Sequence, residues 1–113
     1  MDAKNGEPRL AKVFYLPTKL ICQAIKGRRR LEFEYDGLFR VVEPYCHGTT
    51  IQGRESLRAI QVGGWSRSAM IASGKLWTLA KMTNVKLSSE KFAPDDRHYN
   101  PQDTALPQVH CRI

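Results

Sequence analysis

The segment RLEFEYDGLFRVVE, residues 30–43, decides how this chain folds. Residues 31–35 alternate apolar and acidic side chains, which is the pattern of a half-buried strand. Asp36-Gly37 follows, and both residue types tolerate the positive φ angles of a two-residue hairpin turn. Residues 38–43 then return as the second strand. The segment therefore predicts an antiparallel β-hairpin, and the rest of the fold is placed around it.

A short amphipathic helix is predicted before this hairpin. Pro17-Thr18 begins it, and the Thr18 side chain is suited to the N-cap position. Gly27 is placed to end the helix as a left-handed cap. The apolar side chains fall on one stripe, formed by Leu20, Ile21, Ala24 and Ile25. Because so short a helix is not stable alone, we expect its stripe to lie on the sheet.

Further short strands are predicted after the hairpin. Residues 57–62, 76–79 and 85–87 have the composition of strands, whereas the sequence HGTT at 47–50 predicts a turn. Pro44 removes a ladder donor, so it marks an edge, a bulge or the end of a strand. Several short strands joined by Gly-rich turns, with no βαβ alternation, indicate a small barrel or sandwich.

The chain is expected to form one domain with two tails. Its 113 residues suffice to bury a core without disulfides or a metal. We place an N-terminal tail at residues 1–16, the folded body at 17–93 and an irregular, Pro-rich C-terminal tail at 94–113. The three prolines of the last segment forbid long regular elements there.

Charge and hydropathy limit the partners. The net charge is +7, and residues 56–91 carry six basic side chains against one acid, Glu90, so an anionic partner such as nucleic acid is favoured. No apolar run has the length of a membrane span, so we expect no membrane partner. The polar segment Met1–Pro8 has no signal region, which makes the cytoplasm the expected location.

The cysteines and histidines do not predict a metal site. Three cysteines without a CxxC spacing, Cys22, Cys46 and Cys111, indicate reduced thiols. Cys46-His47 and His110-Cys111 contain zinc-ligand types, but neighbours on an extended chain point to opposite sides. Both members of a pair would not reach one ion. We therefore expect neither a metal nor a cofactor.

The order of these features resembles the WYL-domain family. The likeness extends over residues 19–103, although Glu55-Ser56 stand where the family's name-giving Trp and Tyr would be. Lys81 also replaces a typical arginine, which weakens bidentate anion recognition there. The matching blocks are the helix at 20–25, the strand and turn at 30–37, the return at 40–45, the strand at 57–61, the closing segments at 77–82 and 85–92, and the tail at 99–103.

The resemblance implies a mostly-β fold, namely a small Sm-like β-barrel of about five short strands with an N-terminal helix. It also implies a regulatory module for ligand sensing, associated with transcription regulation or defence. Larger members carry a DNA-binding domain, for which residues 1–16 are too few, so a separate DNA-binding partner protein is one expectation. Unpaired edges of an open barrel also favour a homodimer.

A basic face with aromatic neighbours is the candidate site. Arg40, Arg58 and Lys81 fall on different predicted strands, and such cations can hold phosphates beside rings that stack on bases. Tyr45 with Arg58 corresponds to the family's ligand face. The Arg28–Arg30 run has two interpretations, a cap of the helix dipole or a phosphate contact. The predicted binding residues are Arg30, Arg40, Tyr45, Arg58, Ser66, Arg67, Ser68 and Lys81.

We predict a non-catalytic binding module, with single-stranded nucleic acid as the favoured ligand. The alternative is a small-molecule nucleotide sensor or a protein-assembly module that binds no nucleic acid. An enzyme is less favoured, because G-x-S-x-G, H-E-x-x-H and a recognisable Cys/His dyad are absent from the sequence. The remaining catalytic candidate, a hydrolase cluster of residues 95–98 with Asp103, lies in the Pro-rich tail.

Overall fold

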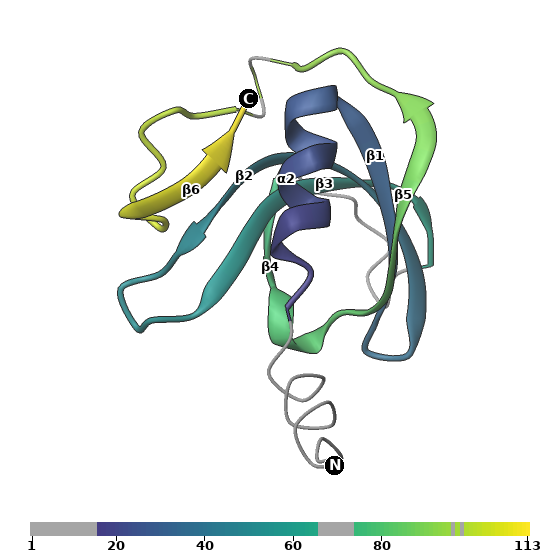
Figure 1. The fold of residues 1–113 in the computed structure, drawn as a ribbon, viewed down its shortest axis with the longest axis horizontal. Coiled ribbons are helices and arrows are strands. Elements are labelled where there is room, and N and C mark those ends of the chain that lie inside the picture. Colours follow the sequence, from purple (N-terminus) through teal and green to yellow (C-terminus); the bar gives the residue numbers. More distant parts are fainter. Residues whose placement is uncertain (1–15, 66–73, 96, 98) are drawn as a thin grey trace, which may run out of the picture.

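The computed structural model describes residues 16–65, 74–95, 97 and 99–113 (Figure 1). These residues form six strands, one α-helix and one 3-10 turn, which confirms the mostly-β prediction with one helix. The elements are α2 (Thr18–Gly27), β1 (Arg29–Tyr35), β2 (Leu38–Thr49), β3 (Glu55–Gly64), β4 (Lys75–Thr78), η1 (Leu79–Lys81), β5 (Thr83–Lys91) and β6 (Gln108–Arg112).

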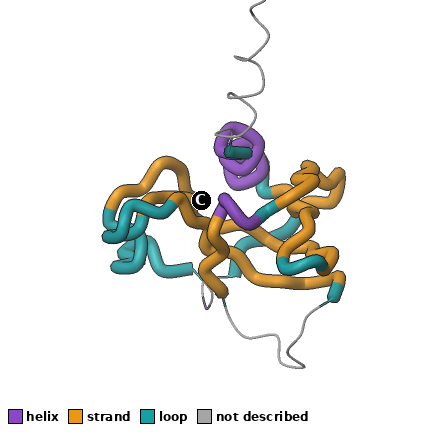
Figure 2. Tube along the Cα trace, turned by 90° about the horizontal axis from the view of Figure 1, so that it is seen from below, coloured by secondary structure: helices purple, strands orange, loops and turns teal. Residues whose placement is uncertain are grey.

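The strands make one antiparallel sheet in the order β4-β3-β2-β1-β5, and β6 pairs with the far end of β2. Figure 2 shows these strands curving in a band, with α2 lying against one side of it. In the part of the chain that the structure describes, the outer strands β4 and β5 are not paired with each other. The sheet is therefore open, and the predicted small barrel is not closed between these strands.

The central hairpin follows the sequence prediction. β1 pairs with β2 from Leu31↔Val42 to Tyr35↔Leu38. The turn residues Asp36 and Gly37 have φ angles of 54° and 74°. Both lie in the left-handed region, which a two-residue hairpin turn of this twist requires.

β2 is longer than predicted because the expected turn at 47–50 is mostly strand. His47, Gly48 and Thr49 continue β2, and the turn falls at residues 50–53 instead. The register shifts beside Pro44, so the proline marks a bulge within the strand. Beyond this bulge β2 leaves β1 and pairs with β6. A Cβ on Gly48 would lie 2.4 Å from the Gln108 carbonyl oxygen, so this position needs glycine for β6 to approach.

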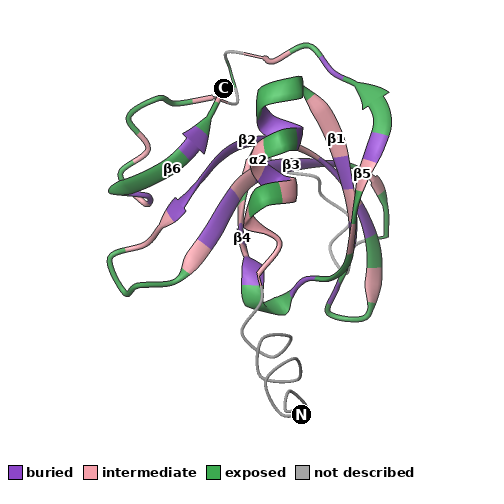
Figure 3. Cartoon of the chain, viewed as in Figure 1, coloured by how far each residue is buried: buried purple, intermediate pink, exposed green. Residues whose placement is uncertain are grey.

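The helix ends differ from prediction by one residue each. Pro17 occupies the N-cap position, and no side chain of the described residues makes a capping hydrogen bond there. The left-handed cap is Arg28, with φ 52°, and not Gly27, which is the last helical residue. The predicted apolar stripe holds, since Ile21, Ala24 and Ile25 are buried against the sheet (Figure 3).

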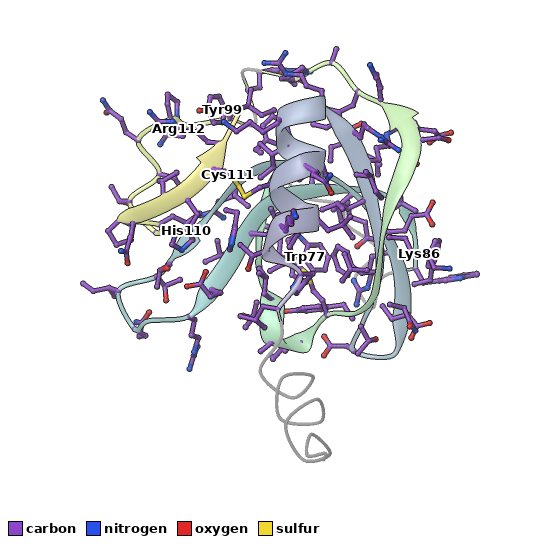
Figure 4. All side chains as sticks on the ribbon, viewed as in Figure 1. Trp77, Lys86, Tyr99, His110, Cys111 and Arg112 are labelled. Carbon is purple, nitrogen blue, oxygen red and sulfur yellow. A yellow bond between two sulfur atoms is a disulfide. The ribbon has the colours of Figure 1, made fainter. Side chains whose placement is uncertain are left out.

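The main core lies between the helix and the inner face of the sheet. Trp77 is fully buried at its centre, with the Phe33 and Tyr35 rings edge-on at centroid distances of 5.3 and 4.9 Å (Figure 4). A smaller cluster of Tyr45, Ile60 and Phe92 packs beneath the C-terminal segment. β2 contributes Val42 to the main core and Tyr45 to the smaller cluster. The helix packs on the first cluster and the C-terminal segment on the second.

The C-terminal tail is not irregular throughout, because it ends in β6. Cys111 of this strand is disulfide-bonded to Cys22 of α2, with a Cα–Cα distance of 5.7 Å (Figure 4). The prediction of three reduced thiols is therefore wrong, and Cys46 alone is a free, buried thiol. Cystines persist in oxidising compartments, so the bond gives no support to the predicted cytoplasmic location. No helix in the described ranges is both long and apolar enough to cross a membrane.

Candidate anion-binding site

Arg30, the first predicted binding residue, is engaged within the sheet. Its side chain lies between Glu43 on β2 and Glu90 on β5, with nitrogen–oxygen distances of 2.9 Å to each. The two carboxylates raise the pKa of Arg30, with Glu43 the larger cause. Neither interpretation of this arginine, as a helix cap or as a phosphate contact, predicted these ion pairs. The side chain links three neighbouring strands by ion pairs.

Arg58 is also paired, and its partner comes from the C-terminal segment. Its Nε and Nη2 donate to the two carboxylate oxygens of Asp103 at 2.7 and 3.1 Å, and Nη1 donates to the Gly74 carbonyl at 3.1 Å. This fork leaves Arg58 with an anion already in place. Asp103 accepts a further hydrogen bond from the Ala105 amide. The pair therefore fastens the tail to β3.

Replacing Asp103 by Asn should lower the free energy of unfolding at pH 7 by about 1–3 kcal/mol, since a charge-assisted hydrogen bond is lost. The Arg58 guanidinium lowers the pKa of Asp103 in the folded state. The Arg58–Asp103 pair therefore stabilises the folded state fully at pH values above about 4, the pKa of Asp103 in the unfolded chain. This stabilisation is lost as the pH falls through the lower pKa of Asp103 in the folded state.

Urea unfolding from pH 7 to pH 3 checks this prediction. The difference in the free energy of unfolding between wild type and D103N should become smaller as the pH falls. The control is Glu90→Gln, which breaks the Arg30 pair at a carboxylate whose side chain is 66 % exposed. That change should cost about 1 kcal/mol or less. Equal losses for the two variants would contradict the role of Asp103.

Tyr45 packs against the C-terminal segment. The residue is fully buried, and its ring lies 6.0 Å from Tyr99 in a stacked arrangement and 5.6 Å from Phe92. Its hydroxyl accepts a hydrogen bond from the Asp95 amide at 3.0 Å. Both residues of the predicted Tyr45–Arg58 ligand face contact the C-terminal segment, which sequence patterns did not place there.

Arg40 is buried in the aromatic end of the core. The residue is 2 % exposed, and its guanidinium donates to the Tyr35 carbonyl at 3.0 Å and to Gln61 Oε1 at 3.2 Å. Its central carbon lies 5.4 Å from the Trp77 ring and 5.9 Å from the Tyr35 ring. Its Nε is buried and has no hydrogen-bond partner in the described part of the chain. Arg40 is therefore a fixed positive charge held by rings and neutral oxygens.

Two lysines converge on the same rings. Lys75 Nζ lies 4.4 Å from the Trp77 ring and 5.8 Å from the Tyr35 ring, and Lys81 Nζ lies 6.0 Å from the Tyr35 ring. With Arg40, three cations thus surround one tyrosine. We call these five residues the Tyr35 cluster. Within the described ranges, none of its cations forms an ion pair with a carboxylate.

Lys75 was missed by the sequence analysis, although the signal was present. In a strand, residues two apart point to the same face, so Lys75 and Trp77 share one side of β4. Lys81 follows from η1, which turns the chain back beneath the same rings. The structure therefore brings together Arg40 and Lys81 of the predicted set and adds Lys75. It does not bring Arg30, Tyr45 or Arg58 to them.

An exposed tryptophan adjoins this cluster. Trp65 is 71 % exposed at the end of β3. Gln61 links it to Arg40, since Oε1 accepts from the guanidinium and Nε2 donates to the Trp65 carbonyl at 2.8 Å. The Trp65 amide donates to the Phe39 carbonyl at 2.7 Å, which fixes the backbone there. The next predicted residues, Ser66, Arg67 and Ser68, lie outside the described residues.

The hydrolase alternative gains little from the structure. Asp95 pairs with exposed Arg97 at 2.7 Å, and Asp103 is bound by Arg58. Asp96 and His98 lie outside the described residues.

Comparisons with known proteins found no match among family models, curated proteins or solved structures. The WYL resemblance therefore stays a prediction.

Proposed function

We propose that this protein binds single-stranded nucleic acid, with backbone phosphates held at the Tyr35 cluster. One observation carries the proposal, namely the convergence of Arg40, Lys75 and Lys81 on one ring, 5.8–6.0 Å from its centre, without a paired carboxylate in the described residues. Like charges repel, so such a group is costly unless an anion offsets it. A phosphate is the anion that a net charge of +7 attracts most generally.

The buried arginine strengthens the attraction at the surface. Because Arg40 is shielded from water, its charge is screened less than that of an exposed side chain. Lys75 and Lys81 are the accessible members that would contact phosphate oxygens directly. We therefore assign Arg40 a positioning and electrostatic role and the two lysines the contact role.

The exposed indole favours a single strand over a duplex. An unpaired base can stack on an aromatic face, whereas stacked bases within a duplex cannot. Trp65 offers an exposed face of this kind, while Trp77 and Tyr35 are buried. Its backbone carbonyl is linked to Arg40 through Gln61, which places the backbone of Trp65 near the phosphate-binding residues.

Among the described residues, one hollow gives the alternative of a nucleotide sensor weaker support. A hollow of about 300 Å³ lies on the outer face of β1 and β5. Glu32 and Glu34 line it together with Lys86, and two carboxylates repel a phosphate.

The proposal also includes the finer fold, an Sm-like barrel left open between β4 and β5, and the regulatory role that this fold implies. It includes dimerisation through an unpaired strand edge as well.

Fluorescence anisotropy with a labelled single-stranded oligonucleotide tests the function. Wild type should bind, and the affinity should fall steeply as salt rises. The double variant Lys75→Ala/Lys81→Ala should bind about ten- to thirty-fold more weakly at 0.1 M salt, because two phosphate contacts are lost. The slope of the logarithm of the binding constant against the logarithm of the salt concentration should also become shallower by about 1.4.

A matched control separates this site from general charge loss. Lys86→Ala/Lys91→Ala removes the same charge from exposed positions on β5 and should leave the slope almost unchanged. Trp65→Ala should weaken binding and preserve the slope, since stacking releases no counterions. Absence of binding at low salt, or equal effects of the two lysine pairs, would overturn the proposal.

A further inference from the structure

A second cluster of polar side chains lies near the end of the β2–β3 hairpin that bears the turn at residues 50–53. His47 comes from β2, Glu55 from β3 and His110 from β6, and one ligand atom of each lies within 4.8 Å of the others. Glu55 Oε1 is 3.6 Å from His47 Nε2 and 3.1 Å from His110 Nε2. His47 and His110 are 63 positions apart in the sequence, yet the three side chains are adjacent in space.

Strand register explains how they meet. Thr49 pairs with Glu55 across β2 and β3, which brings the carboxylate beside the end of β2. On the other side His47 pairs with Cys111 and Gly48 with Val109, so the register shifts and His110 is the extra residue of a bulge. A bulge re-aims a side chain. His110 thus faces Glu55 while its neighbour Cys111 reaches the helix (Figure 4).

The ring of His47 is prepared to act as an acceptor. Its Nδ1 lies 2.9 Å from the Ser56 carbonyl oxygen, which accepts only, so Nδ1 carries the hydrogen and Nε2 keeps its lone pair. This Nε2 is buried, has no hydrogen-bond partner in the part of the chain that the structure describes, and faces Glu55. A buried polar atom without a partner is costly. Burial also lowers the pKa of His47.

The other two side chains are held by Thr49. Its hydroxyl donates to Glu55 Oε2 at 2.6 Å and accepts from His110 Nε2 at 2.8 Å. Glu55 Oε1 remains directed at both histidines. A hydroxyl that orients a ligating carboxylate is the kind of outer contact that metal sites use.

We propose that His47, Glu55 and His110 bind a divalent transition-metal ion such as Zn²⁺. Two imidazole nitrogens and one carboxylate are a ligand set that zinc accepts, with solvent in the fourth position. Tetrahedral ligands at about 2.0–2.1 Å from zinc lie about 3.3–3.4 Å from one another, close to the two separations seen here. Glu55 and His110 are partly exposed, so an ion has a path to the buried His47.

The proposal corrects one step of the sequence argument. That argument asked whether both members of Cys46-His47 or of His110-Cys111 could reach one ion, and neither pair does. One histidine from each pair faces the cluster instead, and Glu55 of a third strand completes it. On binding, His110 must present Nε2 without a hydrogen and give up its donation to Thr49. A neutral ring then carries its hydrogen on Nδ1, whereas an imidazolium keeps Nδ1–H and releases the Nε2 proton to solvent.

Titration calorimetry of the metal-free, disulfide-intact full chain with ZnCl₂ tests the site. One Zn²⁺ per chain should bind. His110→Ala and Glu55→Gln should each weaken binding about 100-fold or more, and Thr49→Val about ten-fold. The control is Val109→Ala, an exposed neighbour of His110 on β6, which should retain wild-type affinity.

Two further readouts make the result decisive. Co²⁺ should give the intense visible absorption of a tetrahedral site in wild type and lose it in H110A. Zn²⁺ should raise the Tm of wild type and V109A but not of E55Q. Binding that H110A and E55Q leave unchanged, or no binding by wild type, would overturn the proposal. Lys75→Ala/Lys81→Ala should keep the zinc response, so this site and the nucleic-acid site fail separately.

Discussion

Reduction of the Cys22–Cys111 disulfide should lower the free energy of unfolding by about 4 kcal/mol. The bond joins residues separated by 89 positions, so it removes a large part of the unfolded chain's freedom. It also ties β6, the strand in which the C-terminal tail ends, to the helix in the main core. A loss of this size is a large fraction of the stability of a small domain.

Urea unfolding with and without dithiothreitol measures this effect. Wild type should shift to a lower midpoint on reduction, whereas Cys22→Ser/Cys111→Ser should be equally weakened in both conditions. Cys46→Ser is the control for loss of a thiol outside the bond, and its reductant shift should match that of wild type. Three reactive thiols in the unreduced protein after unfolding would contradict the bond.

Trp77→Ala should cost about 3–5 kcal/mol, which is the other large effect that we expect. The side chain is fully buried, meets Phe33 and Tyr35 edge-on, and donates from Nε1 to the Ala59 carbonyl at 3.2 Å. Truncation leaves a cavity, two rings without a partner and a buried carbonyl without its donor.

Trp77→Phe separates these contributions. It retains an aromatic ring but loses the hydrogen bond, and it should cost about 1–3 kcal/mol. Circular dichroism is the suitable probe, because both variants remove a fluorophore. A loss below about 1 kcal/mol for W77A would mean that the core repacks around the space.

Local pattern predicted the elements that depend on neighbours in sequence. The alternation at 31–35 and the Asp36-Gly37 turn predicted the hairpin, and the apolar stripe predicted the helix. These features are fixed within a few residues of chain by side-chain period and backbone freedom. The polar HGTT sequence misled because its composition is typical of a turn, whereas His47 to Thr49 pair with β3 on one side and β6 on the other.

The candidate sites depended on partners that local pattern does not show. Arg58 resembled a free phosphate ligand until Asp103, 45 residues later, was seen to hold it. Arg30 likewise meets Glu90, 60 residues away. Which cations remain unpaired is decided by strand order and tail path, so composition predicted a basic protein but not its basic site.

The cystine between the helix and the last strand makes the folded body a covalent ring. Any single cleavage of the backbone between residues 22 and 111, for example in the exposed turn at 50–53, opens this ring without releasing a fragment. The pieces stay joined and keep a high effective concentration for one another. Proteolysis at one point would therefore leave one molecule, and separation would require both a cut and a reductant.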